Sequence, residues 1–432
     1  MQANTFEFTG KQFYLQIACF TALLYFTCMV QTYNNSYTRF DWYEHYYRAR
    51  QILGDFSLYE KIQSPVGPYH YLARPPLQNF IVAIFLGIFG KQFYVYQIIM
   101  LCLNFIQIPA LIYLSNVIQH FRNDKNSNIL CANIMILFTP FIIWNTLYPW
   151  TRGFCNSLII FGFTHVLIAL NNEDYRNNLK KIFLLFGCAC IVHYSAVPYA
   201  IGAVIVLILK SNRKSLVVKN LIYFIAPPLC WFLIAISLFD FNSFYSTNTT
   251  YEWSAQITPF DNLIKVSQNI VCSFAFICPY LSNLDMHAIK YSDILFHIYN
   301  RTVTGQIGFF GLATIFCLQN VKRNYIYILV PLYFILIGLN GNFSLFGLFH
   351  ITGQPLCMIA LTYLFLNAPK ISLFQIFLRA LDFLLGVYLG LGVMFSPIME
   401  EDVNFWHLKQ SEVIRVQDPK IVYIHDIIFT RK

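Results

Sequence analysis

Charged residues are scarce in this sequence. They make up 11% of the 432 residues, against 57% hydrophobic and 18% aromatic residues, and the mean hydropathy is +0.53. A soluble chain of this length would need a larger charged surface, so a soluble fold is excluded. A membrane-spanning helix needs about 20 mostly apolar residues, and the sequence contains roughly ten runs of that kind. We therefore predict an all-helical integral membrane protein.

The sequence also lacks internal repeats, low-complexity segments and cysteines spaced as metal ligands beside histidines. Its 12 cysteines lie almost entirely in apolar runs, which predicts small buried hydrophobic side chains. A disulfide between Cys272 and Cys278 is left open. The net charge of +9 comes from short basic clusters between the apolar runs, a pattern of topology signals, so we expect no nucleic-acid partner.

The basic clusters predict which loops share a side of the membrane. We expect residues 13–31 to be an uncleaved first span, and the 13-residue run 78–90 to lie flat at the interface because it is too short to cross. If it crossed, every later basic cluster would change side. The other expected spans, which give about eleven in all, are 92–115, 129–146, 154–170, 182–192, 196–209, 221–239, 306–319, 325–339, 351–366 and 373–395.

One membrane module is expected over residues 1–398, followed by a short external tail, 399–432. Its two external regions are 32–91 and 240–305. Within the second, the apolar stretch 263–280 is interrupted by polar residues, and we interpret it as interfacial or re-entrant rather than spanning.

The first external region concentrates polar, charged and aromatic residues between two apolar runs. If this segment is helical, Asp41, Glu44 and His45 share one face, because residues three and four apart are neighbours on a helix. Such a group can supply an acid, a base and a hydrogen-bond donor. The alternative, a surface helix whose polar face is merely solvated, is equally compatible with the spacing.

The same external region contains three arginines, Arg48, Arg50 and Arg74, whose guanidinium groups suit bidentate binding of a phosphate group. Ordinary anchoring beside lipid headgroups is the alternative. Tyrosines in this region, Tyr71 among them, can line a sugar or prenyl site or belong to an aromatic belt. Pro75 then fixes an extended entry to the next helix.

These residues resemble the family of C-type membrane glycosyltransferases that includes the lipid A aminoarabinose transferases and the protein O-mannosyltransferases. The pattern begins with Asp41, seven residues and then Ala49-Arg50. It continues with Gly54-Asp55-Phe56, Tyr71, Arg74-Pro75-Pro76-Leu77 and a helix ending at Phe89-Gly90. The similarity extends more loosely over residues 1–210.

The resemblance implies a multi-pass membrane transferase fold and a polyprenyl-phosphate sugar as donor. It implies Asp41 as the catalytic carboxylate and Arg74, at the position of a family lysine, as a contact of the donor phosphate. Arg152 and Arg50 are further candidates for binding that phosphate.

The sequence departs from the family pattern at several positions. Trp42 replaces an acidic residue, so a divalent metal held by paired carboxylates is in doubt, although Glu44 can compensate. His45 stands where the family commonly has Tyr. Asn156 replaces an Asp, and His193 lies near a turn where Lys is frequent. We treat Asn156 and His193 as substrate-lining candidates, with a satisfied interior histidine as the plainer alternative for His193.

Trp150, just before Arg152, belongs to another external turn. It either forms the bottom of the acceptor site or anchors the chain at the membrane interface.

We predict a transferase that moves a sugar from a polyprenyl-phosphate donor to a lipid, glycan or protein acceptor on the non-cytoplasmic face. The membrane would be the inner membrane in a bacterium and the endoplasmic reticulum in a eukaryote. The alternative is a transporter or flippase, which would place more ionisable residues in mid-span than this sequence has.

Overall fold

The structure is a computed structural model. It describes residues 41–58, 75–122, 146, 151–171, 175–210, 214–239 and 241–242, together with 355, 356, 358, 359, 362 and 366. Several expected segments therefore lie wholly or almost entirely outside the described residues. They are the spans 13–31, 129–146, 306–319, 325–339, 351–366 and 373–395, the external region 240–305 and the tail 399–432.

Every regular element among the described residues is a helix. They are α2 (Asp41–Ile52), α3 (Leu77–Phe89), α4 (Phe93–Phe105), α5 (Gln107–Arg122), α8 (Arg152–Asn171), α9 (Tyr175–Val192), the short 3-10 helix η3 (Tyr194–Ala196), α10 (Val197–Lys210) and α11 (Lys214–Leu238). The all-helical class is thus confirmed for this part of the chain.

Three described helical segments are long and apolar enough to cross a membrane: Ile98–Phe121, Arg152–Asn171 and Lys214–Leu238. The first joins most of α4 to α5. They overlap the predicted spans 92–115, 154–170 and 221–239, and the chain is a membrane protein. The total of about eleven spans depends on segments outside the described residues and stays a prediction.

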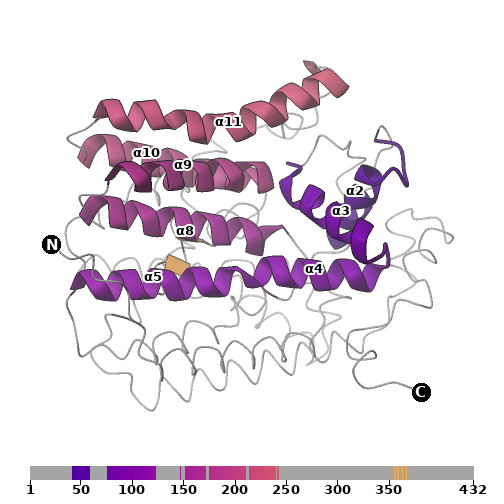
Figure 1. Cartoon of the computed structure of the whole chain (residues 1–432), viewed down its shortest axis with the longest axis horizontal. Helices are drawn as coiled ribbons and strands as arrows, with labels where there is room; N and C mark the ends of the chain where they lie inside the picture. Colours follow the sequence, from indigo (N-terminus) through magenta and orange to yellow (C-terminus); the bar gives the residue numbers. More distant parts are fainter. Residues whose placement is uncertain are drawn as a thin grey trace, which may run out of the picture.

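Helices α4 and α5 follow one another along one line, and α8, α9, α10 and α11 lie beside them with their axes roughly parallel (Figure 1). Helices α8 and α9 are antiparallel, since the Cys155 thiol faces the carbonyl of Ala189 at 3.7 Å near one end, and His165 pairs with Asn178 at 3.1 Å near the other. Helices α2 and α3 lie together at one end of this bundle and are inclined to its axis (Figure 1).

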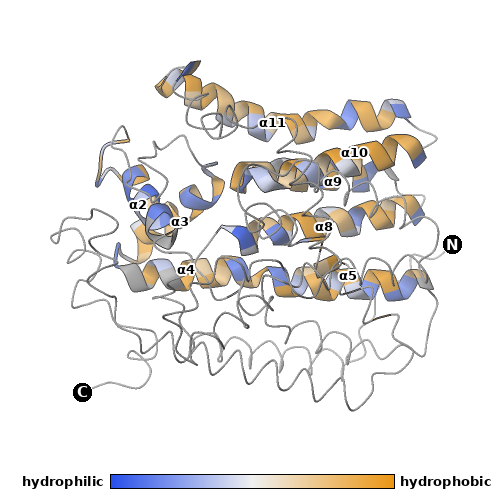
Figure 2. Cartoon of the chain, turned by 180° about the vertical axis from the view of Figure 1, so that it is seen from behind, coloured by the Kyte–Doolittle hydropathy of each residue, from blue (hydrophilic) through white to orange (hydrophobic). Residues whose placement is uncertain are grey.

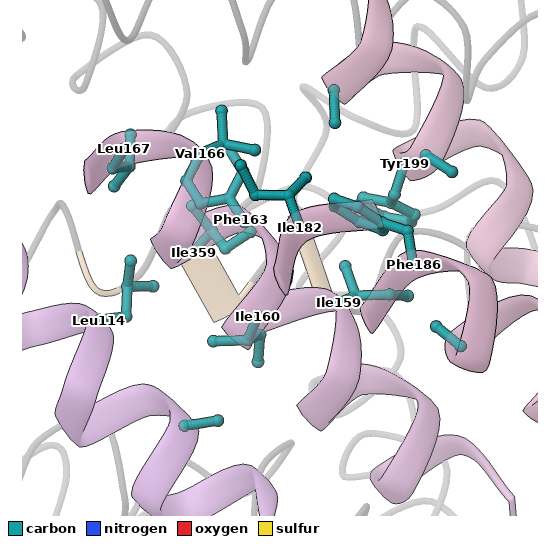
Figure 3. Close-up of a cluster of buried hydrophobic side chains, with 14 of the residues drawn as sticks. Leu114, Ile159, Ile160, Phe163, Val166, Leu167, Ile182, Phe186, Tyr199 and Ile359 are labelled. Carbon is teal, nitrogen blue, oxygen red and sulfur yellow. The ribbon is translucent and has the colours of Figure 1, made fainter. Parts of the chain in front are cut away.

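The bundle core lies between α5, α8, α9 and α10, where Leu114, Ile159, Phe163 and Phe186 pack with their neighbours (Figure 3). Small residues allow the helices to approach. A Cβ atom on Gly162 would lie 3.0 Å from the Phe186 ring. Close backbone approach at small residues is how helices pack in membranes, where lipid removes most of the hydrophobic driving force.

The two ends of the bundle differ in charge. Basic residues gather at the end opposite α2 and α3, namely Arg122 at the end of α5, Arg176, Lys180 and Lys181 in α9, Lys210 at the end of α10, and Lys214 and Lys219 in α11. Figure 2 shows hydrophilic colour on the corresponding ends of α5 and α11 and, at the other end, on α2. The described helices therefore place these basic clusters at one common end, as expected if they share one side of the membrane.

Candidate active site

Helix α2 ends in a Schellman motif. The amide of Gly54 donates to the carbonyl of Gln51 at 3.0 Å, and the amide of Asp55 donates to the carbonyl of Arg50 at 3.1 Å. Gly54 has a φ of +79°, a left-handed conformation that glycine adopts without steric cost. The motif stops α2 and brings Asp55 back beside the side chain of Arg50.

One face of α2 is polar and yet buried. Glu44, His45, Arg48 and Gln51 are 5%, 3%, 0% and 1% exposed. An ion pair joins the Arg48 guanidinium to the Glu44 carboxylate at 2.9 Å. Buried charges persist only when they are paired and hydrogen-bonded, so Glu44 neutralises Arg48 in this setting. The alternative of a merely solvated polar face for α2 is wrong for these residues.

His45 is held by helix α3. Its Nδ1 atom lies 3.1 Å from the Oδ1 atom of Asn79, which is 2% exposed in the first turn of α3. Around this bond, Tyr46 and Ala49 of α2 pack against Val82 and Ala83 of α3. The bond therefore lies within a packed helix–helix contact.

Arg50 points to a different set of partners. Its Nε donates to Asp55 Oδ2 at 2.9 Å, Lys91 pairs with the other carboxylate oxygen, and the Tyr46 hydroxyl donates to the carbonyl of Lys91 at 2.5 Å. The guanidinium also lies 4.9 Å from the centre of the Phe56 ring. These contacts fasten the end of α2 to the junction between α3 and α4, and the phosphate-binding role of Arg50 stays a prediction.

The same contacts change the acidity of Asp55. Burial by itself would raise the pKa of this carboxyl group, but hydrogen bonds and charges from Lys91 and Arg50 outweigh burial, and the pKa lies below its ordinary value. Asp55 is therefore ionised down to acidic pH.

Helix α8 begins with the second predicted group of residues. Arg152 is its first residue and Asn156 lies one turn later, and they are 4% and 2% exposed. The amide of Phe154 donates to Asn104 Oδ1 at 3.3 Å, and a Cβ atom on Gly153 would meet Asn104 at 2.7 Å. Because only glycine fits at 153, the start of α8 lies directly against α4.

His193 caps the short helix that follows α9. Its Nδ1 accepts from the amide of Ser195 at 3.1 Å and lies 2.9 Å from the Ser195 hydroxyl. The Cys155 thiol of α8 lies 3.9 Å from the carbonyl of His193. This turn thus adjoins the first turn of α8, which places His193 near Arg152 and Asn156 in the fold.

The structure brings the described candidates to one end of the bundle. Asp41 is the first residue of α2. Phe154 of α8 packs against the cluster that contains Tyr46 of α2, so the start of α8 and α2 adjoin one another. Among the candidates, Tyr71, Arg74 and Trp150 lie outside the described residues, and their roles stay predictions.

No protein-family model matches the sequence, and no curated protein matches it. Its structure is similar to that of ArnT from Cupriavidus metallidurans bound to undecaprenyl phosphate, with a TM-score of 0.52 and 10% identity over 87% of this chain and 63% of ArnT. The chain has the C-type membrane glycosyltransferase fold. An oligosaccharyltransferase from Archaeoglobus fulgidus in its apo form matches with a TM-score of 0.48 and 12% identity, over 87% of this chain and 56% of that protein. The chain thus spans less than two thirds of the length of either protein.

Within this C-type fold, the described residues include no group of three or more histidine, cysteine or acidic side chains that could hold a metal ion. Glu44 is paired with Arg48, and the Nδ1 of His45 is bonded to Asn79. No step below depends on a divalent metal.

Sequence reasoning missed two amides that shape this end of the C-type fold, Asn79 and Asn104. Each is buried, and each bonds to a residue at least 34 positions away. A signal was present, because polar residues inside apolar membrane segments are costly and usually have a specific partner. The sequence alone did not identify that partner.

Proposed function

We propose that the protein is a membrane glycosyltransferase that moves a sugar from a polyprenyl-phosphate donor to a lipid, glycan or protein acceptor on the non-cytoplasmic face. The observation that carries the proposal is the buried polar face of α2, at one end of a bundle with the C-type fold. Burying an ion pair and a histidine is costly, which a merely structural helix would not require.

The donor class is supported by two features. The ArnT structure contains bound undecaprenyl phosphate. In this chain, Arg152 lies buried at the start of α8, a helix N-terminus at which backbone amides and the helix dipole favour an anion. Arg152, with Arg74 and Arg50, is therefore proposed to hold the donor phosphate.

In the proposed reaction, a nucleophilic group of the acceptor attacks the anomeric carbon of the donor sugar. The bond from that carbon to the phosphate oxygen breaks, and its electron pair leaves with the prenyl phosphate. Asp41 accepts the proton of the nucleophile. Arg152 and Arg74 stabilise the negative charge that grows on the departing phosphate. The substrate-binding site is lined by Tyr71, Trp150, Asn156 and His193.

The proposal is tested by reconstituting the purified protein in vesicles with a panel of labelled polyprenyl-phosphate sugars and by measuring release of prenyl phosphate. We expect Asp41→Asn to lower turnover by at least about 100-fold, the usual contribution of a general base. The matched control is Asp55→Asn, the same chemical change at a carboxylate bonded to Arg50 and Lys91. Since an asparagine amide oxygen still accepts the hydrogen bond from Arg50, this variant should lose far less turnover than Asp41→Asn.

Full turnover by the Asp41→Asn variant would contradict the assignment of Asp41. Movement of labelled lipid or solute across the vesicle without release of prenyl phosphate would instead favour a transporter or flippase.

A further inference from the structure

The orientation of the Asn79 amide beside His45 favours one tautomer of the histidine ring. Asn79 presents its amide oxygen, Oδ1, to Nδ1 of His45 at 3.1 Å. An amide oxygen can only accept a hydrogen bond, so in this orientation of the Asn79 amide Nδ1 is the donor. A neutral imidazole with a proton on Nδ1 carries its lone pair on Nε2, and Nε2 is then the proton acceptor.

We propose that Asn79 is a positioning residue that holds His45 in the Nδ1–H form, so that Nε2 serves as a proton acceptor during sugar transfer. This role rests on the proposed function. His45 lies one helical turn after Asp41 on α2. The two positions therefore share a side of the helix, and Nε2 can receive the proton that Asp41 removes from the nucleophilic group. This leaves Asp41 ionised and His45 as the imidazolium.

Helix α3 is well placed to hold Asn79 rigidly. It begins directly after Pro76, and Asn79 lies in its first turn. The adjacent residue, Gln78, is fully buried and donates to the sulfur of Met100 in α4 at 3.0 Å. Leu86, two turns later, packs in the cluster shared with α2 and α4. The amide of Asn79 is thus fixed by packing on both sides of its helix.

Among the described residues, few charged groups lie around His45. Glu44 and Arg48 flank it on α2 and are paired with each other. Helix α3 contains no ionisable residue, and α4 contains only two tyrosines and a cysteine. Arg50, Asp55 and Lys91 form their own cluster. At this end of the bundle α8 and the turn after α9 add Arg152, Cys155, Cys190 and His193. A new charge at position 79 would therefore act on His45 directly.

The first measurement is the tautomer of His45, read from ring nitrogen shifts in protein labelled with nitrogen-15 histidine and held in nanodiscs. The signal is assigned by its loss in His45→Gln. In the wild type we expect the neutral Nδ1–H form. Asn79→Leu, which keeps the size but removes the acceptor, should populate the Nε2–H form. Gln78→Leu is the matched control, an identical kind of change at a buried amide bonded to Met100, and should leave the His45 signal unchanged.

The second measurement is the titration of His45 in Asn79→Asp. A carboxylate at this distance favours the charged imidazolium, so the pKa of His45 should rise by about one to three units relative to the wild type. Since transfer requires neutral His45, the acidic limb of the pH–rate profile should move up by the same amount. A merely structural role for Asn79 would lower the rate equally at all pH values.

The results separate this inference from the proposed function. An Nε2–H form in the wild type, or an unchanged tautomer in a folded Asn79→Leu variant, would overturn the role of Asn79 even if the enzyme transfers sugar. The measurement of the tautomer needs no substrate. If the wild type shows the expected tautomer but transfers sugar from none of the donors, the proposed function and the catalytic use of Nε2 are both overturned. If Asn79→Asp does not fold, Asn79→Leu decides the matter by the same spectrum.

Discussion

The buried ion pair between Glu44 and Arg48 is the clearest case of one residue depending on another in this protein. The guanidinium is fully buried and the carboxylate nearly so. Each charge is tolerated because the other is 2.9 Å away. Removing one partner of a buried pair usually costs about 3–5 kcal/mol, whereas replacing both by apolar groups of similar size is often close to neutral.

We therefore expect Glu44→Leu and Arg48→Met each to lower the free energy of unfolding by about 3–5 kcal/mol. The double variant should lose much less than the sum of the two single changes. Denaturant unfolding of the purified protein in one detergent checks this. Additive losses would show that the two side chains are not coupled and would contradict the ion pair.

At the scale of elements, the cluster of Arg50, Asp55 and Lys91 joins α2 to the junction between α3 and α4. Because the pKa of Asp55 is lower in the folded protein than in the unfolded chain, its stabilising contribution is fully present above the unfolded value, near pH 4. That contribution is lost as the pH falls through the folded value. Lys91 is 44% exposed, so solvent screens part of the interaction.

We expect Asp55→Asn to lower thermal stability modestly at neutral pH, by about 1 kcal/mol or less. The difference from the wild type should shrink as the pH falls below about 4, where wild-type Asp55 also becomes neutral. Thermal denaturation of both proteins across pH checks this. A difference that stays constant down to strongly acidic pH would mean that the charge of Asp55 is not what stabilises the junction.

Several elements could be predicted from the sequence because local signals determine them. The run 78–90 differs by one residue at each end from α3, Leu77–Phe89, since Pro76 sets its start and Gly90, with a φ of +110°, sets its end. Helices α9 and α11 begin at Tyr175 and Lys214, about two turns before the predicted spans 182–192 and 221–239. Hydropathy finds only the apolar part of a helix that continues into a basic first turn.

The contacts between separate helices of the site could not be predicted in this way. Within α2, Glu44 and Arg48 are four residues apart, so helical spacing alone brings them together. The bond from His45 to Asn79 joins residues 34 positions apart, and that from Phe154 to Asn104 spans 50. Such contacts depend on how separate helices pack, which no local pattern of residues specifies.

At the scale of the whole molecule, the candidate residues and the basic clusters lie at opposite ends of the helix bundle (Figure 1). Helices α5, α8 and α10 run away from the end with α2, while α9 and α11 return to it. If the three long apolar segments cross the membrane, the two ends lie on opposite sides of it. Positive charge near span ends is retained on the cytoplasmic side, which would put α2 on the other face.

We expect Ser57→Cys, after α2, and Ser215→Cys, in the first turn of α11, to react with a membrane-impermeant maleimide from opposite sides of sealed vesicles. Both residues are exposed in the structure. The parent protein measures background labelling of its own cysteines, and detergent-opened vesicles should label both variants. Labelling of both from the same side would contradict this arrangement of the bundle.

Helix α3 reverses the usual placement of polar and apolar side chains in an amphipathic helix. Its polar residues Gln78 and Asn79 are buried, whereas Phe80, Ile84 and Ile88 are between 48% and 67% exposed. Its outer face therefore suits the hydrocarbon boundary, while its inner face holds His45. The helix that meets the lipid on one side is thus the one that orients a buried histidine on the other, and a change in bilayer thickness would act first on this helix.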